Sequence, residues 1–219
     1  MRVAVISDVH ANLPALEAVL EDLGSLDVLL NAGDVVGYNP WPEACVDAMR
    51  SRDVPTVRGN HDRAVVENTD FRFNSMAAAG VEYAREQLDD EQLEWLESLP
   101  EELTRFDDRV RVVHGHPDDP DRYTYPADFD SSMLDGADAL ILGHTHVQHV
   151  EHYDDGIVLN PGSVGQPRDR TPAAAYAILD LDAMDVELRR VEYDVQQVID
   201  AVEDAGLPGE VGERLRVGR

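Results

Sequence analysis

Residues 2–10, RVAVISDVH, decide how the chain is built. The apolar run from Arg2 to Ile6 predicts a short buried strand. Two side chains able to bind a metal, Asp8 and His10, follow this strand directly. A helix is expected next, because leucines recur at helical spacing between residues 13 and 23. A strand that ends in polar residues and leads into a helix is typical of an α/β protein.

The first half of the chain repeats this alternation. Further strands are expected near residues 27–30 and 54–57, with a helix over 42–50 between them. Strand, helix, strand, helix, strand implies a parallel sheet with both faces covered. Two more helices, over residues 74–87 and 89–99, complete this half.

After Pro100 the pattern becomes rich in strands, and a helical tail begins near Val195. We expect strands at residues 103–106, 110–114, 139–142, 149–153, 157–160, 174–181 and 186–193. The sequence has no internal repeat, low-complexity tract or shift in composition that would mark a boundary, so we predict one domain over residues 1–219. Two β-sheets packed together with helices outside accommodate both halves.

Acidic side chains dominate the charge of the chain. The 45 acidic and 18 basic residues give a net charge of −27, and every basic residue is arginine. We interpret this composition as adaptation to molar salt, where the Debye length falls to ~3 Å. Binding to nucleic acid is disfavoured, because it requires lysine or arginine side chains that displace counterions.

The hydrophobic content, 43% of 219 residues, is sufficient for a substantial core. No apolar run approaches the ~20 residues needed to cross a bilayer, and no signal peptide is evident, so we expect a cytoplasmic protein with no membrane contact. The single cysteine, Cys45, is expected to be a buried apolar side chain, not a metal ligand.

The side chains able to bind metals fall at the ends of the expected strands. Because the carboxyl ends of parallel strands meet at one edge of a sheet, these side chains are expected to converge. The candidate ligands are Asp8, His10, Asp34, Asn60, His114, His144 and His146. Oxygen and nitrogen ligands without cysteine suit one or two divalent cations such as Mn, Fe, Co, Ni or Zn. Seven ligands are too many for one zinc, so two ions sharing a carboxylate are predicted.

These residues lie in five short blocks, and in that order the blocks resemble the calcineurin-like metallophosphoesterase superfamily. The blocks are Ser7-Asp8-Val9-His10, Gly33-Asp34, Gly59-Asn60-His61-Asp62, His114-Gly115-His116 and Gly143-His144-Thr145-His146. Residues 33–38 (GDVVGY) and 160–169 (NPGSVGQPRD) are similar to a small prokaryotic branch of phosphodiesterases and diadenosine-tetraphosphatase-like proteins. The resemblance implies a four-layer α/β/β/α sandwich of two mixed β-sheets flanked by helices.

The resemblance also implies a role for each ligand. It assigns Asp8, His10 and His146 to one ion, Asn60, His114 and His144 to the other, and Asp34 to both. It implies that His61 faces the leaving group as a proton donor or charge stabiliser. Much of the superfamily has a second Asp that orients this histidine, where this chain has Gly37; Asp62 is the local candidate for that task.

The predicted function is hydrolysis of a small phosphate monoester or diester by attack of a metal-bound hydroxide at a dinuclear centre. Arg58 and Arg168 are candidates for binding the substrate phosphate, with ion-pair roles as the equal alternative. Tyr38, Tyr123 and Tyr125 are candidates for stacking on a base, although we expect two of the three to be ordinary packing residues.

Two other functions remain open. A non-catalytic binding or scaffold protein on the same fold is disfavoured because all seven ligands and His61 are present. A nuclease is disfavoured by the net charge and by the absence of a basic stripe.

Overall fold

Two mixed β-sheets form the centre of the computed structural model, which describes residues 1–24, 28–69 and 73–219. The first sheet has the order β2 (Leu29–Asn31), β1 (Arg2–Ile6), β8 (Ala174–Asp180) and β9 (Asp185–Val191). The second has the order β3 (Glu102–Arg105), β4 (Val110–Val113), β5 (Ala139–Ile141), β7 (Gly156–Asn160) and β6 (His149–Tyr153). Strands β1 and β2 are parallel, as are β4, β5 and β7, and the remaining pairs are antiparallel. The predicted architecture is confirmed.

Strand β1 is apolar from Val3 to Ile6, because both faces of the sheet are covered there. Val3 and Val5 face the second sheet and pack with side chains of β4, β5 and β7, whereas Ile6 faces the helices. This alternation follows from the period of two residues in a strand. Every one of these three side chains is fully buried.

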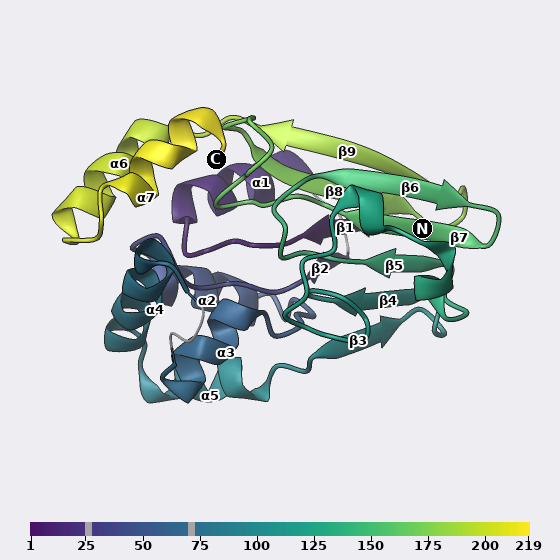
Figure 1. Cartoon of the computed structure of the whole chain (residues 1–219), viewed down its shortest axis with the longest axis horizontal. Coiled ribbons are helices and arrows are strands. Elements are labelled where there is room, and N and C mark those ends of the chain that lie inside the picture. The colour runs from purple at the N-terminus through teal and green to yellow at the C-terminus, as the bar shows by residue number, and fades with distance from the viewer. Residues whose placement is uncertain (25–27, 70–72) are drawn as a thin grey trace.

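Helices cover the outer face of the first sheet. They are α1 (Leu13–Leu23), α2 (Pro42–Arg50), α3 (Asn60–Glu67), α4 (Ser75–Gln87) and α5 (Asp90–Ser98). Cys45 is buried in this layer, as predicted. Figure 1 shows α2 to α5 gathered at one side of the molecule, while the strands extend toward the other. Among the described residues, no helix has the length and hydropathy required to span a bilayer.

Two smaller groups of helices complete the layers. The outer face of the second sheet is covered by the short 3-10 helices η1 (Pro126–Asp128) and η2 (Ser131–Leu134). The tail forms α6 (Val195–Asp204), α7 (Glu210–Glu213) and η3 (Arg214–Val217), which pack against α4. Figure 1 shows α6 and α7 above α4, on the same side of the molecule.

The seven strands expected after Pro100 are all present, within two residues of their predicted bounds. The strand predicted at 27–30 is observed as β2, and its first position, Asp27, lies outside the described residues. The strand predicted at 54–57 was wrong: it is reduced to one bridge between Asn31 and Thr56. The carbonyl of Pro55 accepts from the Asn31 amide at 3.0 Å, but Pro55 has no amide proton to donate, so the ladder does not extend further.

Helix α3 was not predicted, because its first turn is polar. It begins immediately after Gly59, whose amide donates to the Asp62 carboxylate at 3.0 Å. An acidic residue three positions after the N-cap is a helix-start signal. Since the apolar spacing here is weak, this capping pattern was the only local indication of the helix.

Helix α4 lies unusually close to the loop that follows β2. A Cβ atom at Gly80 would lie 2.1 Å from the backbone nitrogen of Tyr38. No side chain fits into that space, so glycine at this position lets α4 pack against the loop that carries Asp34 and Tyr38.

We predict that Gly80→Ala destabilises the protein by roughly 1–3 kcal/mol, because the clash outweighs the ~1 kcal/mol that alanine gains in a helix. The matched control is Gly209→Ala, where φ is −56° and nothing lies within 4 Å of the added methyl group. The control should change stability by less than ~0.5 kcal/mol. Denaturant unfolding in molar salt measures both variants, and equal stability of the two would show that the close contact is unimportant.

Candidate metal centre

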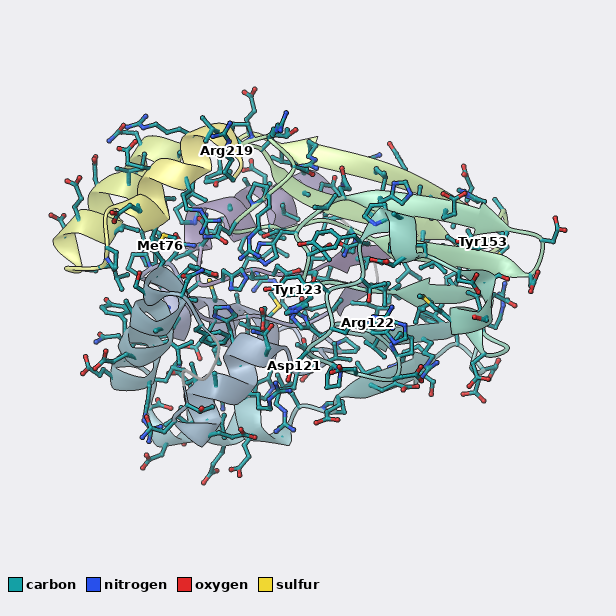
Figure 2. The ribbon with its side chains drawn as sticks, in the orientation of Figure 1. Met76, Asp121, Arg122, Tyr123, Tyr153 and Arg219 are labelled. Carbon is teal, nitrogen blue, oxygen red and sulfur yellow. The ribbon has the colours of Figure 1, made fainter. Side chains whose placement is uncertain are left out.

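The structure brings the seven predicted ligand side chains together at the carboxyl ends of the strands. Asp8 and His10 follow β1, Asp34 follows β2, and Asn60 opens α3. His114 follows β4, and the pair His144 and His146 follows β5. None of the seven is more than 9% exposed. Tyr123, labelled in Figure 2, lies next to this group, with its ring centroid 4.0 Å from that of His144.

One cluster is formed by Asp8, His10 and His146. The Nε2 atom of His146 lies 3.2 Å from Asp8 Oδ1, and that of His10 lies 3.7 Å from the same oxygen. The two Nε2 atoms are 3.1 Å apart. Three potential ligand atoms therefore surround one small space.

A second cluster is formed by Asp34, His114 and His144, with Asn60 at its edge. The Nε2 atom of His114 lies 3.3 Å from Asp34 Oδ2 and 3.1 Å from Asn60 Oδ1. The same Asp34 oxygen lies 3.7 Å from His10 Nε2 in the first cluster. Asp34 thus stands between the two clusters.

Backbone carbonyl groups orient three of the imidazole rings. The Nδ1 atoms of His10, His114 and His146 lie 3.1, 2.8 and 2.6 Å from the carbonyl oxygens of Val36, Ala32 and Gln166, respectively. When each Nδ1–H donates to its carbonyl, the Nε2 lone pair points into the cluster.

The inward-facing atoms then lack hydrogens between them. Two Nε2 lone pairs 3.1 Å apart repel each other, and Asp8 Oδ1 and His144 Nε2 are buried with no hydrogen-bond partner among the described residues. Buried acceptors without donors are costly unless a cation satisfies them. The donor set therefore fits divalent metal ions, which imidazole and carboxylate ligands bind well.

The protonation states expected for His114 and His144 also indicate a site for a cation. Burial disfavours a charged imidazole, but the carboxylate of Asp34 more than offsets this and raises the pKa of His114 to about 10. Burial lowers the pKa of His144 to about 3. A proton on His114 thus balances the charge of Asp34, and a metal ion would replace that proton.

The backbone at the ligands is held in an uncommon conformation. Positive φ angles of 48–67° occur at Asp8, His10, Asp34, His144 and His146. Such angles in residues other than glycine cost free energy and persist where surrounding contacts impose them.

Asp62 supplies one of those contacts. Its carboxylate accepts hydrogen bonds from the amides of Asp34, Val35 and Val36 at 2.9–3.2 Å. The expectation that Asp62 orients His61 was wrong, because its carboxylate oxygens bind these backbone amides and the amide of Gly59. Asp62 fixes the loop that carries Asp34.

His61 is oriented by aromatic side chains. Its ring stacks on Phe73 with a centroid distance of 4.5 Å, and Tyr38 and His10 lie at 4.9 and 4.7 Å. A Cβ atom at Gly37 would come within 2.4 Å of His61 Nδ1, so glycine there makes room for the ring. Burial lowers the pKa of His61 to about 4, which leaves the imidazole neutral.

Phe73 was missed by the sequence analysis. It lies just before α4, and no local motif distinguishes it from an ordinary packing residue.

The two candidate arginines have different surroundings. Arg168 lines a cavity of ≈ 50 Å³ together with Asp34, His61 and Tyr123. Arg58 is not among the residues that line this cavity; its guanidinium lies 3.5 Å from Glu101 and donates to the carbonyl of Glu97. The structure therefore places Arg168 beside the candidate metal ligands and Arg58 in an ion pair.

Of the three tyrosines, Tyr38 is buried, whereas Tyr123 and Tyr125 are each 47% exposed and stack on each other.

Comparison with known proteins identifies the family. The calcineurin-like phosphoesterase superfamily domain matches residues 1–184. The chain is 34% identical to the uncharacterized protein MJ0912 of Methanocaldococcus jannaschii, over 99% of this chain and 98% of that protein. It is 30% identical to the phosphodiesterase YfcE of Escherichia coli, over 85% and 91% of the two chains. The crystal structure of a metallophosphoesterase from Sphaerobacter thermophilus superposes with a TM-score of 0.85 at 36% identity, over 100% of both chains. This chain belongs to the calcineurin-like phosphoesterase superfamily.

Proposed function

We propose that the protein hydrolyses a small phosphate monoester or diester with the help of two divalent metal ions. The observation that carries this proposal is the placement of Asp34 between two clusters of buried imidazole and carboxylate groups. Asp8, His10 and His146 would hold one ion, Asn60, His114 and His144 the other, and Asp34 both. Such a pair of ions activates water and stabilises charge on the attacking and leaving oxygens of a phosphoryl transfer.

His61 is the proposed catalytic side chain. One of its ring nitrogens lies within 4.8 Å of the ligand atoms of His10 and Asp34, so it adjoins the reacting group. A neutral imidazole can donate one N–H to the leaving oxygen and stabilise the charge that develops there. Stacking on Phe73 holds the ring in place for this role.

The dimensions and charge of the site favour a small substrate over a polynucleotide. The cavity beside the candidate ligands is small, at ≈ 50 Å³. The net charge of −27 repels a long phosphate backbone across the protein surface. We therefore place the nuclease function behind hydrolysis of a small ester; a non-catalytic scaffold is disfavoured because all seven candidate ligands and His61 are present.

The first test compares p-nitrophenyl phosphate with bis-p-nitrophenyl phosphate in molar salt, with Mn, Ni, Co, Zn or Mg added to metal-free enzyme. We expect metal-dependent hydrolysis of at least one ester, because the ligand clusters require cations. Measuring p-nitrophenol release separates monoesterase from diesterase. Failure with all five metals would support a scaffold, and faster cleavage of single-stranded oligonucleotides would support a nuclease.

Asp34→Asn should weaken metal binding and lower kcat/KM by at least ~100-fold, since the amide oxygen carries no charge to share between two ions. Calorimetric metal titration and steady-state kinetics measure the two effects. Asp107→Asn, at an exposed turn position with φ 56°, is the matched control and should leave both unchanged. Near-normal activity of Asp34→Asn would remove this residue from its proposed role.

His61→Ala should lower kcat by ~100-fold or more while metal stoichiometry is retained. Phe73→Leu should lower kcat about tenfold with little change in KM, because the imidazole loses its stacking partner. Phe73→Tyr keeps an aromatic ring and should restore kcat. A fall in metal binding in Phe73→Leu, or no recovery in Phe73→Tyr, would indicate that Phe73 supports the fold and not the orientation of His61.

A further inference from the structure

Two exposed aromatic side chains lie beside the candidate metal ligands. Tyr123 lines the small cavity, and its ring centroid lies 4.0 Å from that of His144. Tyr125, two positions further along the chain, is 47% exposed, as is Tyr123. Among the described residues, three other large hydrophobic side chains are exposed, and none of them lines this cavity: Met1, Leu188 and Val217. The two tyrosines therefore place exposed aromatic surface next to the candidate ligands.

The two tyrosine rings are nearly parallel. Their centroids are 6.0 Å apart, and their planes meet at an angle of 13°. Tyr125 is not among the residues that line the cavity, so the pair extends from the cavity wall to the surface beyond it. A further planar group that lies against either ring can adopt the offset-stacked geometry that aromatic rings favour.

The loop that carries the tyrosines is held by hydrogen bonds on both sides of them. His116 and Asp119 exchange two backbone hydrogen bonds of 3.1 Å before the pair. After it, the amide of Tyr125 donates to the Asp128 carboxylate at 3.0 Å. Thr124, between the two tyrosines, is buried. Because this backbone is fixed beforehand, little conformational entropy is lost when the rings contact a ligand.

An ion pair joins this loop to the helix that carries two residues of the metal centre. Asp121 pairs with Arg63 of α3, and the same helix begins with Asn60 and His61. Asp121 and Tyr123, both labelled in Figure 2, lie close to each other on the loop. The ion pair therefore links the position of the tyrosines to that of the candidate ligands.

The charge of the loop limits the groups that can lie against it. Residues 115–128 contain four aspartates and one arginine: Asp118, Asp119, Asp121, Asp128 and Arg122. A second anionic group of a substrate would be repelled here, whereas an uncharged planar group would not. The loop thus favours a substrate whose phosphate is attached to a neutral aromatic part.

We propose that Tyr123 and Tyr125 stack on the base of a nucleoside phosphate ester, which is the preferred class of substrate. This inference rests on the proposed hydrolysis of phosphate esters at the adjoining centre. A nucleoside phosphate has both required features, because its phosphate is anionic and its base is planar and uncharged at neutral pH. Bases stack on aromatic side chains without a specific hydrogen bond, so the pair selects nucleoside esters over esters of aliphatic alcohols and accepts more than one base.

The test compares the inhibition constants of AMP and ribose 5-phosphate against whichever p-nitrophenyl ester the metal-loaded enzyme hydrolyses. The two probes share a ribose and a 5′-phosphate and differ by adenine. We expect AMP to bind at least about fivefold more tightly, which is the lower end of the effect of stacking one base on an aromatic side chain.

Tyr125→Ala should abolish most of the AMP advantage, because one of the two rings is lost. Tyr125→Phe keeps the ring and should retain the advantage, because stacking requires no hydroxyl group. Leu188→Ala is the matched control: Leu188 is also an exposed apolar side chain, 38% exposed, but it lies on the edge strand β9. It should leave the ratio of the two inhibition constants unchanged. Melting temperatures of the three variants establish that each is folded.

Equal binding of AMP and ribose 5-phosphate by the wild type would overturn the proposal, as would an AMP advantage that is unchanged in Tyr125→Ala or lost in Tyr125→Phe. If the wild type hydrolyses neither p-nitrophenyl ester, the proposed function fails separately. Calorimetric titration of the metal-loaded protein with the same two probes then decides the stacking site, since a Tyr125-dependent ratio of affinities requires no turnover. Absence of binding by both probes in that titration would also overturn the proposal.

Discussion

Mutual repulsion among buried lone pairs is the constraint on which the site depends. In the first cluster the Nε2 atoms of His10 and His146 and the Oδ1 atom of Asp8 lie within 3.1–3.7 Å of one another, and both rings have their Nδ1 atoms directed at backbone carbonyl groups. Left alone, these atoms would separate. Their positions are fixed by the left-handed backbone conformation of five ligand residues. The Asp62 carboxylate also accepts hydrogen bonds from backbone amides of the loop after β2. Such an arrangement is stable as a binding site for cations because the fold maintains the geometry before the cations arrive.

Most of the candidate ligand set could be predicted from the sequence, because the features that mark these residues are local. Six of the seven ligands follow an apolar strand within a few residues, Asn60 follows the apolar segment 54–57, and parallel strands bring their ends together. The features that failed depend on distant contacts. The carboxylate of Asp62 appeared free to contact its neighbour His61, but amides of residues 34–36, nearly thirty positions earlier, bind it instead. The strand at 54–57 had suitable apolar residues, yet Pro55 limits it to a bridge.

The histidine at position 61 illustrates how one structural task can be met by different chemistry. With Gly37 in place of an acidic residue, the ring of His61 approaches the backbone directly and no carboxylate is needed there to hold it. Aromatic packing by Phe73 and Tyr38 restricts the ring on its flanks. An aromatic partner fixes orientation without adding a charge, so the imidazole remains neutral in its buried position. A motif around His61 cannot reveal that aromatic side chains replace the carboxylate, because Phe73 lies in a different segment of the chain.

The strongly negative charge of the chain bears on which anions can approach the site. An extended polyanion would meet repulsion along most of the protein surface, whereas a compact anion can remain within reach of Arg168, which lines the cavity. High salt would screen the distant carboxylates more than the short contacts within a partly buried site. The proposed small substrate is therefore more compatible with this acidic surface than a polynucleotide is, and Arg168 supplies a positive charge where the cavity meets the candidate ligands.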